Sequence, residues 1–587
     1  MTPAPTVVHG ATEPALWHKT LGELIDEQEA RYGAREAVVV PWQSVRLTYS
    51  QLAQRSRILA QAMLNMGLQP GDCVGIMAGN CYQYIEVFLG GGRIGCPVVV
   101  LNNTYTPVEL TRAVRQSCMS HKTLSPTKTD HSSACKLVFI SSTIGTRSLA
   151  GHVDALRGKQ SPNSGLPELR RVVLTDEGLY GQAGVEVQSY DTFTRHSQPS
   201  LRVQAEIARK ISSEDVLNLQ FTSGTTGSPK AAMLTHTNLL NNARFVGQAM
   251  GLGPEDVICC SPPLFHCFGL VLGFLASFCH GSSIFFASDF FDVKRTVNAI
   301  LAEDATVILG VPTMYIAELE ALARLGKKPR RLRTGLASGS SVSQALMNRL
   351  RAEMGVEKML IAYGMTETSP VTFITGLDDS DEKRTSTVGR VIPHTAAKVV
   401  NRNGRILPRG ERGELCISGF ALQKGYWRNE EKTKEVMRPD ENGVVWMHTG
   451  DEAVLDDDGY ASITGRIKDL IIRGGENIFP REIEERLMAH PAISEASVVG
   501  IKNERYGEVV GCFLKSIREG SRPCHDELRQ HVSQTLGRHK APQHIFWIGD
   551  AGVGDDFPKT GSGKHQKHIL RDIGNRLVEL GSVRARL

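Results

Sequence analysis

The stretch FTSGTTGSPK, residues 221–230, joins an apolar, strand-like run (residues 216–221) to a loop of hydroxyls and glycines that ends in a lysine. Gly224 and Gly227 allow backbone amides to turn toward an anion, and Lys230 adds a positive charge. A flexible Ser/Gly linker is the simpler alternative, but the loop lies inside an ordered pattern and contains no acidic residue. The stretch therefore predicts a phosphate-binding loop. It differs from the GxxxxGK loop of the common nucleoside triphosphatases, which would need glycine at Pro229.

Length and charge exclude several classes of protein. A chain of 587 residues is too long for one compact core, so about two to four folding units are expected. The net charge of +5 is small and the basic residues are spread out, which argues against nucleic acid as a partner. The twelve cysteines are scattered, without a repeated CxxC spacing, which predicts neither a disulfide framework nor a structural zinc site.

The two ends of the chain bear on its location. The N-terminal segment has neither a basic start nor an apolar stretch, so we expect no secretory signal. The longest apolar run, residues 269–279, is about half of the ~20 residues that a membrane helix needs, which predicts a soluble protein without a membrane span. The terminal tripeptide Ala585-Arg586-Leu587 is typical of a C-terminal peroxisomal address that an import receptor reads. A tail without function is the alternative, and a cytoplasmic location would follow from it.

Strand-like and helical segments alternate along most of the chain. Residues 96–101 and 305–311 are predicted to be buried strands, whereas residues 50–67 and 107–115 have helical periodicity. Strands that alternate with helices indicate a parallel or mixed sheet covered on both faces. Residues 118–132 interrupt this pattern with a polar, aperiodic stretch, which is either a surface loop or an unspliced intron carried into the translation.

The character of the chain changes near residue 395. Short alternating strands separated by turns predict a small β-barrel or distorted sheet over about residues 395–465; the turn signals are Asn403-Gly404, Arg409-Gly410, Asn442-Gly443 and Asp458-Gly459. A helix at about 480–489 and short strands follow. We therefore place a boundary between an N-terminal domain, residues 1–466, and a small α+β C-terminal domain, residues 467–587.

Five motifs in one order carry a resemblance to a known family. The loop at 222–230 resembles the signature loop of the adenylate-forming, AMP-binding superfamily, which includes acyl-CoA synthetases, luciferases and peptide-synthetase adenylation domains. The other four motifs are YGMTE (363–367), TGD (449–451), GRIKD (465–469) with GGEN (474–477) behind it, and PKTGSGK (558–564). The resemblance covers essentially the whole chain. It implies a large N-terminal domain of two α/β subdomains plus a small β-barrel, followed by a mobile α+β C-terminal domain.

The resemblance assigns the nucleotide site residue by residue. Tyr363 would stack on adenine, Asp451 would accept both ribose hydroxyls with help from Arg466, and Glu367 would hold Mg²⁺ beside Thr366, which touches phosphate. Read alone, Asp451 is also compatible with a plain turn. The loop residues expected to bind ATP are Thr222, Ser223, Gly224, Thr225, Thr226, Gly227 and Lys230.

The same resemblance implies the catalytic lysine and the acyl pocket. Lys564 would reach the substrate carboxylate and the α-phosphate and offset charge as the carboxylate attacks phosphorus. His266 would form a wall of the carboxylate site without acting as a base, because a carboxylate at pH 7 needs no deprotonation. The remaining pocket residues are expected to be Val311, Thr313, Ser338, Gly339 and Thr368.

The second step needs an acceptor. The chain continues for 23 residues after Lys564, too few for a carrier domain, so we expect coenzyme A to supply the thiol. Gly475 would let the pantetheine arm pass close to the backbone. The family swings its C-terminal domain about a hinge, here Lys468, so that one pocket serves two reactions.

The sequence departs from the family pattern at two positions beside these motifs. Ala231 stands where relatives usually have glycine, and His565 follows Lys564 where an aliphatic residue is common. Both lie outside the residues that bear the chemistry.

The expected activity is an ATP- and Mg²⁺-dependent acid:CoA ligase. The strings YGMTETSP (363–370) and RGGENIFP (473–480) are most similar to the medium-chain acyl-CoA synthetase branch, especially fungal members. Within it, the resemblance to enzymes of peroxisomal siderophore biosynthesis implies mevalonate or a medium-chain fatty acid as substrate. Three alternatives remain. The substrate could be an aromatic acid, the enzyme could load a carrier protein in trans, or the chain could be a catalytically silent nucleotide-binding protein.

Overall fold

The computed structural model describes residues 7–118, 135–157, 166, 168–176, 186–222, 229–338, 342–474, 476–517, 520, 522–560 and 564–581. Two compact units result. The larger comprises His9–Ala396 and Ile417–Met447; the smaller comprises the described residues of Met1–Val8, Ala397–Cys416 and His448–Leu587. The α/β class predicted from the sequence is confirmed by the sheets and helices of these units.

A seven-stranded sheet carries the phosphate-loop segment in the larger unit. Its order is β10 (Glu186–Ser189), β9 (Arg171–Leu174), β6 (Cys135–Ile140), β4 (Cys73–Met77), β5 (Val98–Val100), β11 (Val216–Thr222) and β12 (Lys230–Thr235). All neighbours are parallel except β11 and β12, which are antiparallel. Strands buried on both faces account for continuous apolar runs such as 98–100.

A nine-stranded sheet forms the second layer of the same unit. Its order is β19 (Arg390–Val391), β18 (Val371–Ile374), β17 (Lys358–Gly364), β16 (Thr334–Ser338), β15 (Val307–Gly310), β13 (Val257–Cys260), β14 (Ser283–Phe285), β2 (Glu36–Val40) and β3 (Val45–Thr48). The strands from β17 to β2 are parallel, so the C-terminal ends of β15, β16 and β17 lie at one edge.

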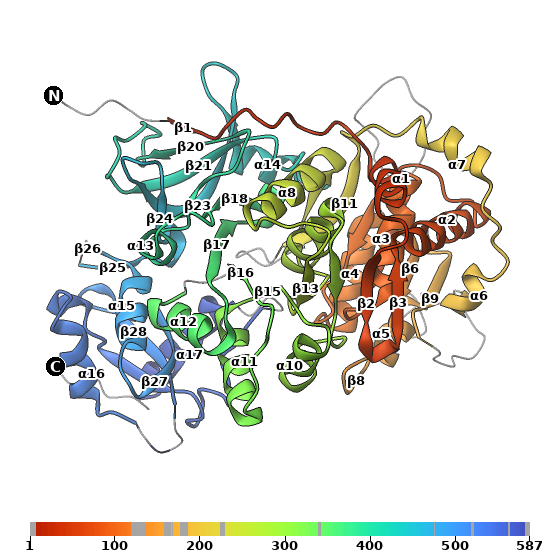
Figure 1. The fold of residues 1–587 in the computed structure, drawn as a ribbon. Coiled ribbons are helices and arrows are strands. Elements are labelled where there is room, and N and C mark those ends of the chain that lie inside the picture. Colours follow the sequence, from red (N-terminus) through yellow and green to blue (C-terminus); the bar gives the residue numbers. More distant parts are fainter. Residues whose placement is uncertain are drawn as a thin grey trace. The chain divides into compact units, whose positions relative to one another are not determined.

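One layer of helices packs between these two sheets (Figure 1). It contains α1 (Leu21–Tyr32), α2 (Tyr49–Asn65), α3 (Tyr82–Arg93), α8 (His236–Ala249), the π-helix η2 (Phe268–Leu275) and α9 (Ala276–His280). Threonine caps begin three of them: Thr20, Thr48 and Thr235 each form a reciprocal capping box with the third helical residue.

Two further helical layers cover the outer faces. α10 (Val293–Ala302), α11 (Pro312–Leu325), α12 (Gln344–Arg349) and the π-turn η3 (Leu350–Met354) pack on the nine-stranded sheet. α4 (Pro107–Cys118) and α5 (Ala150–Leu156) pack on the seven-stranded sheet. The larger unit is therefore a layered α/β structure whose sheets are covered on both faces, as its strand and helix pattern predicts.

Short elements complete the larger unit. They are the helices α6 (Tyr190–Thr194), α7 (Leu201–Ala208), α13 (Asp381–Ser386) and α14 (Glu430–Val436), the 3₁₀ turns η1 (Pro41–Gln43) and η4 (Thr366–Thr368), and the hairpin of β7 (Thr143–Ile144) and β8 (Arg147–Ser148).

A six-stranded sheet follows in the chain. Its order is β1 (Val7–His9), β20 (Thr395–Val400), β21 (Gly413–Gly419), β23 (Val445–Leu455) and β22 (Met437–Pro439), with β24 (Ala461–Arg466) beside β23. The glycines of the four predicted turns (Gly404, Gly410, Gly443 and Gly459) have φ values of 78°, 82°, 77° and 81°, in the left-handed region.

The C-terminal part of the smaller unit is built on a five-stranded sheet. Its order is β26 (Glu476–Ile478), β25 (Ile471–Arg473), β28 (Gly507–Ser516) and β27 (Ile493–Asn503), with β29 (His544–Trp547) beside β28. α15 (Pro480–Met488) and α16 (His525–Ser533) cover one face, and α17 (Lys567–Glu579) packs on the other. The 3₁₀ turns η5 (Ile467–Asp469) and η6 (Arg538–Lys540) are the remaining elements.

The elements predicted from the sequence are confirmed with small shifts of their ends. The strands expected at 96–101 and 305–311 are β5 and β15, and the helices expected at 50–67 and 107–115 are α2 and α4. Residues 119–132 of the stretch predicted to be a loop or an intron lie outside the described residues. Among the helices that the structure describes, none is long and apolar enough to span a membrane.

Candidate functional site

The base of the predicted phosphate loop is a pair of antiparallel strands. Thr222 ends β11 and Lys230 begins β12, and the two residues are register partners. The Thr222 hydroxyl donates to the Lys230 carbonyl at 3.4 Å. The two ends of the loop are thus held together. The predicted loop residues Ser223, Gly224, Thr225, Thr226 and Gly227 lie outside the described residues.

Tyr426 links the lysine of this loop to the predicted metal ligand. The Lys230 Nζ lies over the Tyr426 ring, 5.2 Å from its centroid. The Tyr426 hydroxyl donates to Glu367 Oε1 at 2.8 Å, and Glu367 is only 6% exposed. Burial and the neighbouring Glu367 raise the pKa of Tyr426 far above its ordinary value, so the hydroxyl keeps its proton and donates. Two of the predicted site residues therefore share one aromatic partner.

Backbone bonds to β12 explain why Tyr426 reaches this position. The Met233 amide donates to the Gly425 carbonyl at 3.0 Å, and the Trp427 amide donates to the Ala231 carbonyl at 2.7 Å. Ala231, the alanine found in place of the usual family glycine, is fully buried. Its methyl group faces the protein interior, so the departure from the family leaves the backbone pairing intact.

Thr366 and Glu367 belong to a short 3₁₀ turn that directly follows β17. The Thr368 hydroxyl donates to the carbonyls of Met365 and Pro370 at 3.0 and 2.8 Å, and so ties the turn together. The Thr366 side chain forms a hydrogen bond with Cys267, whose pKa burial raises to about 12. Cys267 is therefore a neutral thiol at physiological pH. This contact joins the predicted phosphate-contacting threonine to the segment of His266.

His266 lies where a loop enters η2. Its Nδ1 accepts a hydrogen bond from the Phe268 amide at 3.1 Å, so a neutral ring carries its proton on Nε2. The loop is fixed to β11, because the Gln220 side chain donates to the Phe265 carbonyl at 2.6 Å. His266 is half-buried. The geometry fits a donor at the wall of a polar site.

The predicted acyl-pocket residues follow adjacent parallel strands. Val311 is the N-cap of α11 directly after β15, and Ser338 ends β16. Tyr363, which is predicted to stack on adenine, lies near the end of the neighbouring strand β17. The Ser338 hydroxyl donates to the Ala362 carbonyl at 3.0 Å. The carboxyl edge of a parallel sheet is where ligands bind in α/β proteins. Thr313 is exposed in the first turn of α11, Thr368 is fully buried, and Gly339 lies outside the described residues.

The smaller unit contains the predicted ribose site. Asp451 and Arg466 are register partners on β23 and β24, and Arg466 Nε lies 3.3 Å from Asp451 Oδ1. The Asp451 side chain is 10% exposed and that of Arg466 is 44% exposed. The structure therefore brings these two predicted residues together, with the carboxylate held and the guanidinium reaching solvent.

Sequence reasoning missed the residues that shape the turn before Asp451. Glu414 Oε1 accepts from the Gly450 amide at 3.2 Å, and Glu414 Oε2 lies 2.8 Å from His448 Nδ1. The Thr449 hydroxyl donates to the Leu415 carbonyl and accepts from the Asp451 amide. Glu414 and His448 are 34 positions apart, and no local pattern reveals their pairing.

Cys416 is the third member of this group. Its thiol lies 3.5 Å from His448 Nδ1, and the ligand atoms of Glu414, Cys416 and His448 all lie within 4.8 Å of one another. Within the described residues this is the one group of three that could hold a metal ion. The hydrogen bonds among its members and to the Gly450 amide already give it a structural role.

The remaining predicted residues lie on turns of the smaller unit. Lys468 is exposed in η5, directly after β24, and Lys564 is exposed at the end of the C-terminal lysine loop. The Lys564 amide donates to the Thr560 hydroxyl at 3.1 Å. Gly475 lies outside the described residues.

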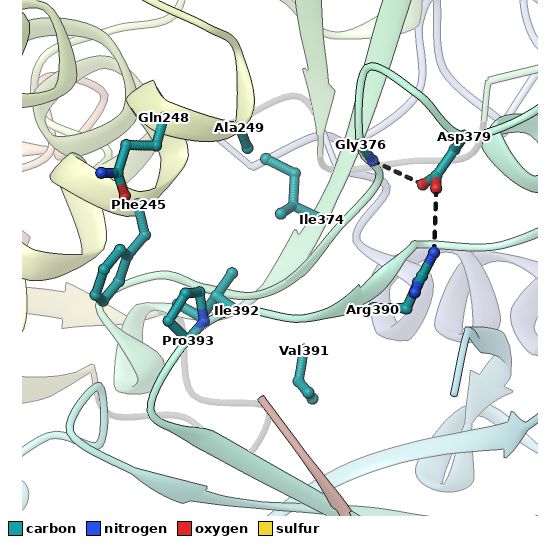
Figure 2. A pocket seen from close by; sticks show the side chains of 10 residues that line it. All are labelled: Phe245, Gln248, Ala249, Ile374, Gly376, Asp379, Arg390, Val391, Ile392 and Pro393. Atoms are coloured by element: carbon teal, nitrogen blue, oxygen red, sulfur yellow. Dashed lines mark hydrogen bonds and ion pairs between the residues drawn. The ribbon is translucent and has the colours of Figure 1, made fainter. Parts of the chain in front are cut away.

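A pocket of about 380 Å³ in the larger unit contains none of the predicted site residues (Figure 2). Apolar side chains such as Phe245 and Ile374 form part of its lining. At its rim Arg390 lies 3.6 Å from Asp379, whose other oxygen accepts from the Gly376 amide at 2.7 Å. The charged groups at the rim are already paired with one another.

Comparison with known proteins shows which family the sequence matches. The model described as AMP-binding enzyme matches residues 25–427, and the model described as AMP-binding enzyme C-terminal domain matches residues 482–564. The chain is 48% identical to acyl-CoA ligase SID4 of Ajellomyces capsulatus over 97% of this chain and 94% of that protein. It is 36% identical to the mitochondrial medium-chain acyl-CoA ligase ACSF2 of Danio rerio over 96% of this chain and 90% of that protein.

Solved structures share the fold. The anthranilate CoA ligase AuaEII in complex with anthranoyl-AMP superposes with a TM-score of 0.80 at 21% identity, over 96% of this chain and 98% of that chain. The ATP-bound RpMatB-BxBclM chimera B3 superposes with a TM-score of 0.74 at 26% identity, over 95% of this chain and 99% of that chain.

Proposed function

Because the chain belongs to the AMP-binding enzyme family, we propose that it is an ATP-dependent acid:CoA ligase that forms an acyl-adenylate and then an acyl-CoA thioester. The observation that carries the proposal is the contact of Tyr426 with both Lys230 and Glu367, which unites two signature segments in one polar site. The near-full-length similarity to proteins named acyl-CoA ligases supports the choice of reaction.

In the first step, a substrate carboxylate oxygen attacks the α-phosphorus of ATP, and the bond to pyrophosphate breaks. Residues 222–227 and Lys230 would bind the phosphates, with Thr366 beside them, while Tyr363 would stack on adenine and Asp451, with Arg466, would take the ribose hydroxyls. Glu367 fits as a Mg²⁺ ligand, because a buried carboxylate beside a phosphate-binding lysine suits a hard cation that neutralises phosphate charge. Lys564 would offset the charge on the attacked phosphate.

In the second step, the thiolate of coenzyme A attacks the acyl carbonyl carbon, and AMP leaves with its phosphate oxygen. Gly475 would give the pantetheine arm close access to the backbone, and His266 with Val311, Thr313, Ser338, Gly339 and Thr368 would line the acyl pocket. The boundary near residue 466, with the hinge at Lys468, would let the C-terminal domain exchange Lys564 for Gly475 between the two steps.

The substrate that we propose is a small or medium-chain acid, mevalonate or a medium-chain fatty acid. Relatives named medium-chain acyl-CoA ligases support a medium-chain acid, whereas mevalonate is proposed from the resemblance that the sequence motifs carry. A place in fungal siderophore biosynthesis and a peroxisomal location, through Ala585-Arg586-Leu587, complete the proposal. A fluorescent fusion that keeps or lacks this tripeptide tests the location.

Release of AMP with a panel of acids tests the function. Mevalonate, medium-chain, long-chain and aromatic acids are each offered with ATP, Mg²⁺ and coenzyme A. We expect AMP release that depends on coenzyme A and is fastest with mevalonate or a medium-chain acid. Fastest release with an aromatic acid would replace the substrate class. Exchange of pyrophosphate into ATP without any response to coenzyme A would indicate carrier loading, and the absence of exchange would contradict the proposal.

A further inference from the structure

One carboxylate holds both ends of the loop that carries Lys564. Glu495 Oε1 lies 2.7 Å from Lys559 Nζ and 2.8 Å from His565 Nε2. Glu495 is on β27, 70 positions before His565 in the chain. We call Glu495, Lys559 and His565 the loop clamp. Lys559 directly precedes residues 560–564 and His565 directly follows them.

Backbone bonds close the same loop from within. Lys559 and His565 form an antiparallel bridge, and the Thr560 amide donates to the Lys564 carbonyl at 2.8 Å. The Gln566 amide donates to the Pro558 carbonyl at 2.7 Å. The chain therefore enters and leaves the loop through paired backbone, and the Glu495 carboxylate fixes that pair to β27.

The imidazole of His565 is held on two sides. Its ring stacks on Phe557, with centroids 4.3 Å apart and planes 14° apart, while Nε2 meets Glu495. The side chains of His565 and Glu495 are 17% and 16% exposed. Although burial opposes ionisation, the hydrogen bonds from His565 and Lys559 hold the pKa of Glu495 below its ordinary value. A half-buried, charge-assisted contact of this kind is stronger than a surface ion pair.

We propose that His565 and Glu495 are positioning residues that orient the loop of Lys564 for the adenylation step. The inference rests on the proposed function, in which Lys564 offsets charge at the attacked phosphate. An aliphatic side chain at 565, as is common in the family, could stack on Phe557 but could not donate to Glu495. In this chain the ring provides both contacts. The histidine at 565, which departs from the family pattern, thus holds the loop through its contact with Glu495.

Substitutions that separate the two contacts test the clamp. His565→Leu keeps an apolar contact with Phe557 and removes the donor, whereas His565→Gln restores a donor to Glu495. We expect His565→Leu to slow ATP–pyrophosphate exchange about 10- to 100-fold, since a displacement of ~1 Å of a catalytic group can cost about 10²-fold. Thioester formation from supplied acyl-AMP is expected to stay at the wild-type rate. His565→Gln is expected to recover most of the lost exchange.

A double-substitution cycle and a matched control make the result specific. Glu495→Ala removes the carboxylate that both Lys559 and His565 contact, so it should slow ATP–pyrophosphate exchange at least as much as His565→Leu. The double variant should be no slower than Glu495→Ala alone, because His565 then has no carboxylate to contact. Lys567→Met is the control: Lys567 pairs with Glu484 at 2.7 Å with similar burial, but outside residues 559–565. It should leave both half-reactions unchanged.

Three kinetic outcomes would overturn the clamp: an unchanged rate of ATP–pyrophosphate exchange in His565→Leu, an equal loss of both half-reactions, or additive effects in the double variant. Hydrogen exchange of the Thr560 and Lys564 amides adds a readout that needs no substrate. Amide exchange should be faster in His565→Leu and Glu495→Ala but not in Lys567→Met, and unchanged protection would contradict the clamp. Wild-type protein that exchanges no pyrophosphate with any acid would refute the proposed function, while amide exchange would still decide the clamp.

Discussion

Tyr426 shows how much one side chain contributes to this site. Its ring lies under Lys230 and its hydroxyl donates to Glu367, although these partners are 196 and 59 positions away along the chain. No motif in the sequence analysis included it. A tyrosine in the string GYW is compatible with any packed turn, and only the pairing of residues 424–427 with β12 places it between the two charged groups.

Removal of that hydroxyl is the first test at this scale. Tyr426→Phe keeps the ring under Lys230 but leaves Glu367 without a donor in a buried position. A lost hydrogen bond to a buried charged group costs roughly 1.5–3 kcal/mol, so we expect ATP–pyrophosphate exchange to fall about 10- to 100-fold. Tyr190→Phe is the matched control, because the buried Tyr190 hydroxyl donates to Glu86 at 2.5 Å among residues outside the site. A similar fall in both variants would mean that the effect is one of stability alone.

Glu318 provides the second test, one of stability against pH. It is 1% exposed on α11, and burial raises its pKa to about 8 from an ordinary value of 4.5. The folded state therefore binds this proton more tightly than the unfolded state, and stability is lost as pH rises from about 4.5 to about 8. Each unit of pKa difference is worth about 1.4 kcal/mol.

Glu318→Gln removes this titration and keeps the shape of the protonated acid. We expect the variant to gain stability relative to the wild type as pH rises, measured as the difference in urea midpoint at about pH 5.5 and about pH 8. Glu320→Gln, on the same helix but paired with Arg324 at the surface, should leave the pH dependence of the wild type in place. A difference that stays constant with pH would contradict the assignment.

At the scale of elements, the strands around the TGD motif show what a local pattern can predict. Alternating residues and glycine turns predicted the short strands of residues 395–465, because side chains alternate and the left-handed turns need glycine. The pairing of β21 with β23, in contrast, is not predicted by any local pattern. It places Glu414 next to the Gly450 amide and His448, and so forms the turn that presents Asp451.

Loss of the Glu414 carboxylate should loosen this turn. Glu414→Ala removes the acceptor for the Gly450 amide, and we expect the KM for ATP to rise several-fold with a smaller effect on kcat, because Asp451 is proposed to bind ribose in both the ground and transition states. Steady-state kinetics at varied ATP measure this split. Glu452→Ala is the control. It removes the carboxylate on β23 that accepts a hydrogen bond from the Thr464 hydroxyl on β24, and this variant should bind ATP normally. A fall in kcat alone would point to a different role for Glu414.

At the scale of the whole molecule, the predicted site residues are divided between the two units. The larger unit contains Lys230, Glu367 and His266, and the smaller contains Asp451 and Lys564. In the proposed mechanism, the two half-reactions use different residues of the C-terminal part, Lys564 and Gly475. The domain boundary at residue 466 and the hinge at Lys468 stay predictions.

Lys564→Ala tests the division of labour. Loss of the positive charge at the attacked phosphate should slow adenylation by about 10²–10³-fold, the size typical of a lost electrostatic contact to a transition state. Thioester formation from supplied acyl-AMP should proceed as in the wild type. Both half-reactions are followed separately, by pyrophosphate exchange and by consumption of the thiol. Equal loss of the two rates would refute the separate roles.

The sequence by itself determined the fold class, the order of the five motifs and the family, because strand and helix periods, turn glycines and motif spacing are local properties of the chain. The tertiary structure alone decided which side chains become partners. Tyr426 with Glu367, Glu414 with His448 and Glu495 with His565 are separated by 59, 34 and 70 positions. These residue pairs form only when segments that are distant in the chain pack together in the folded protein. No local sequence pattern specifies which segments become neighbours.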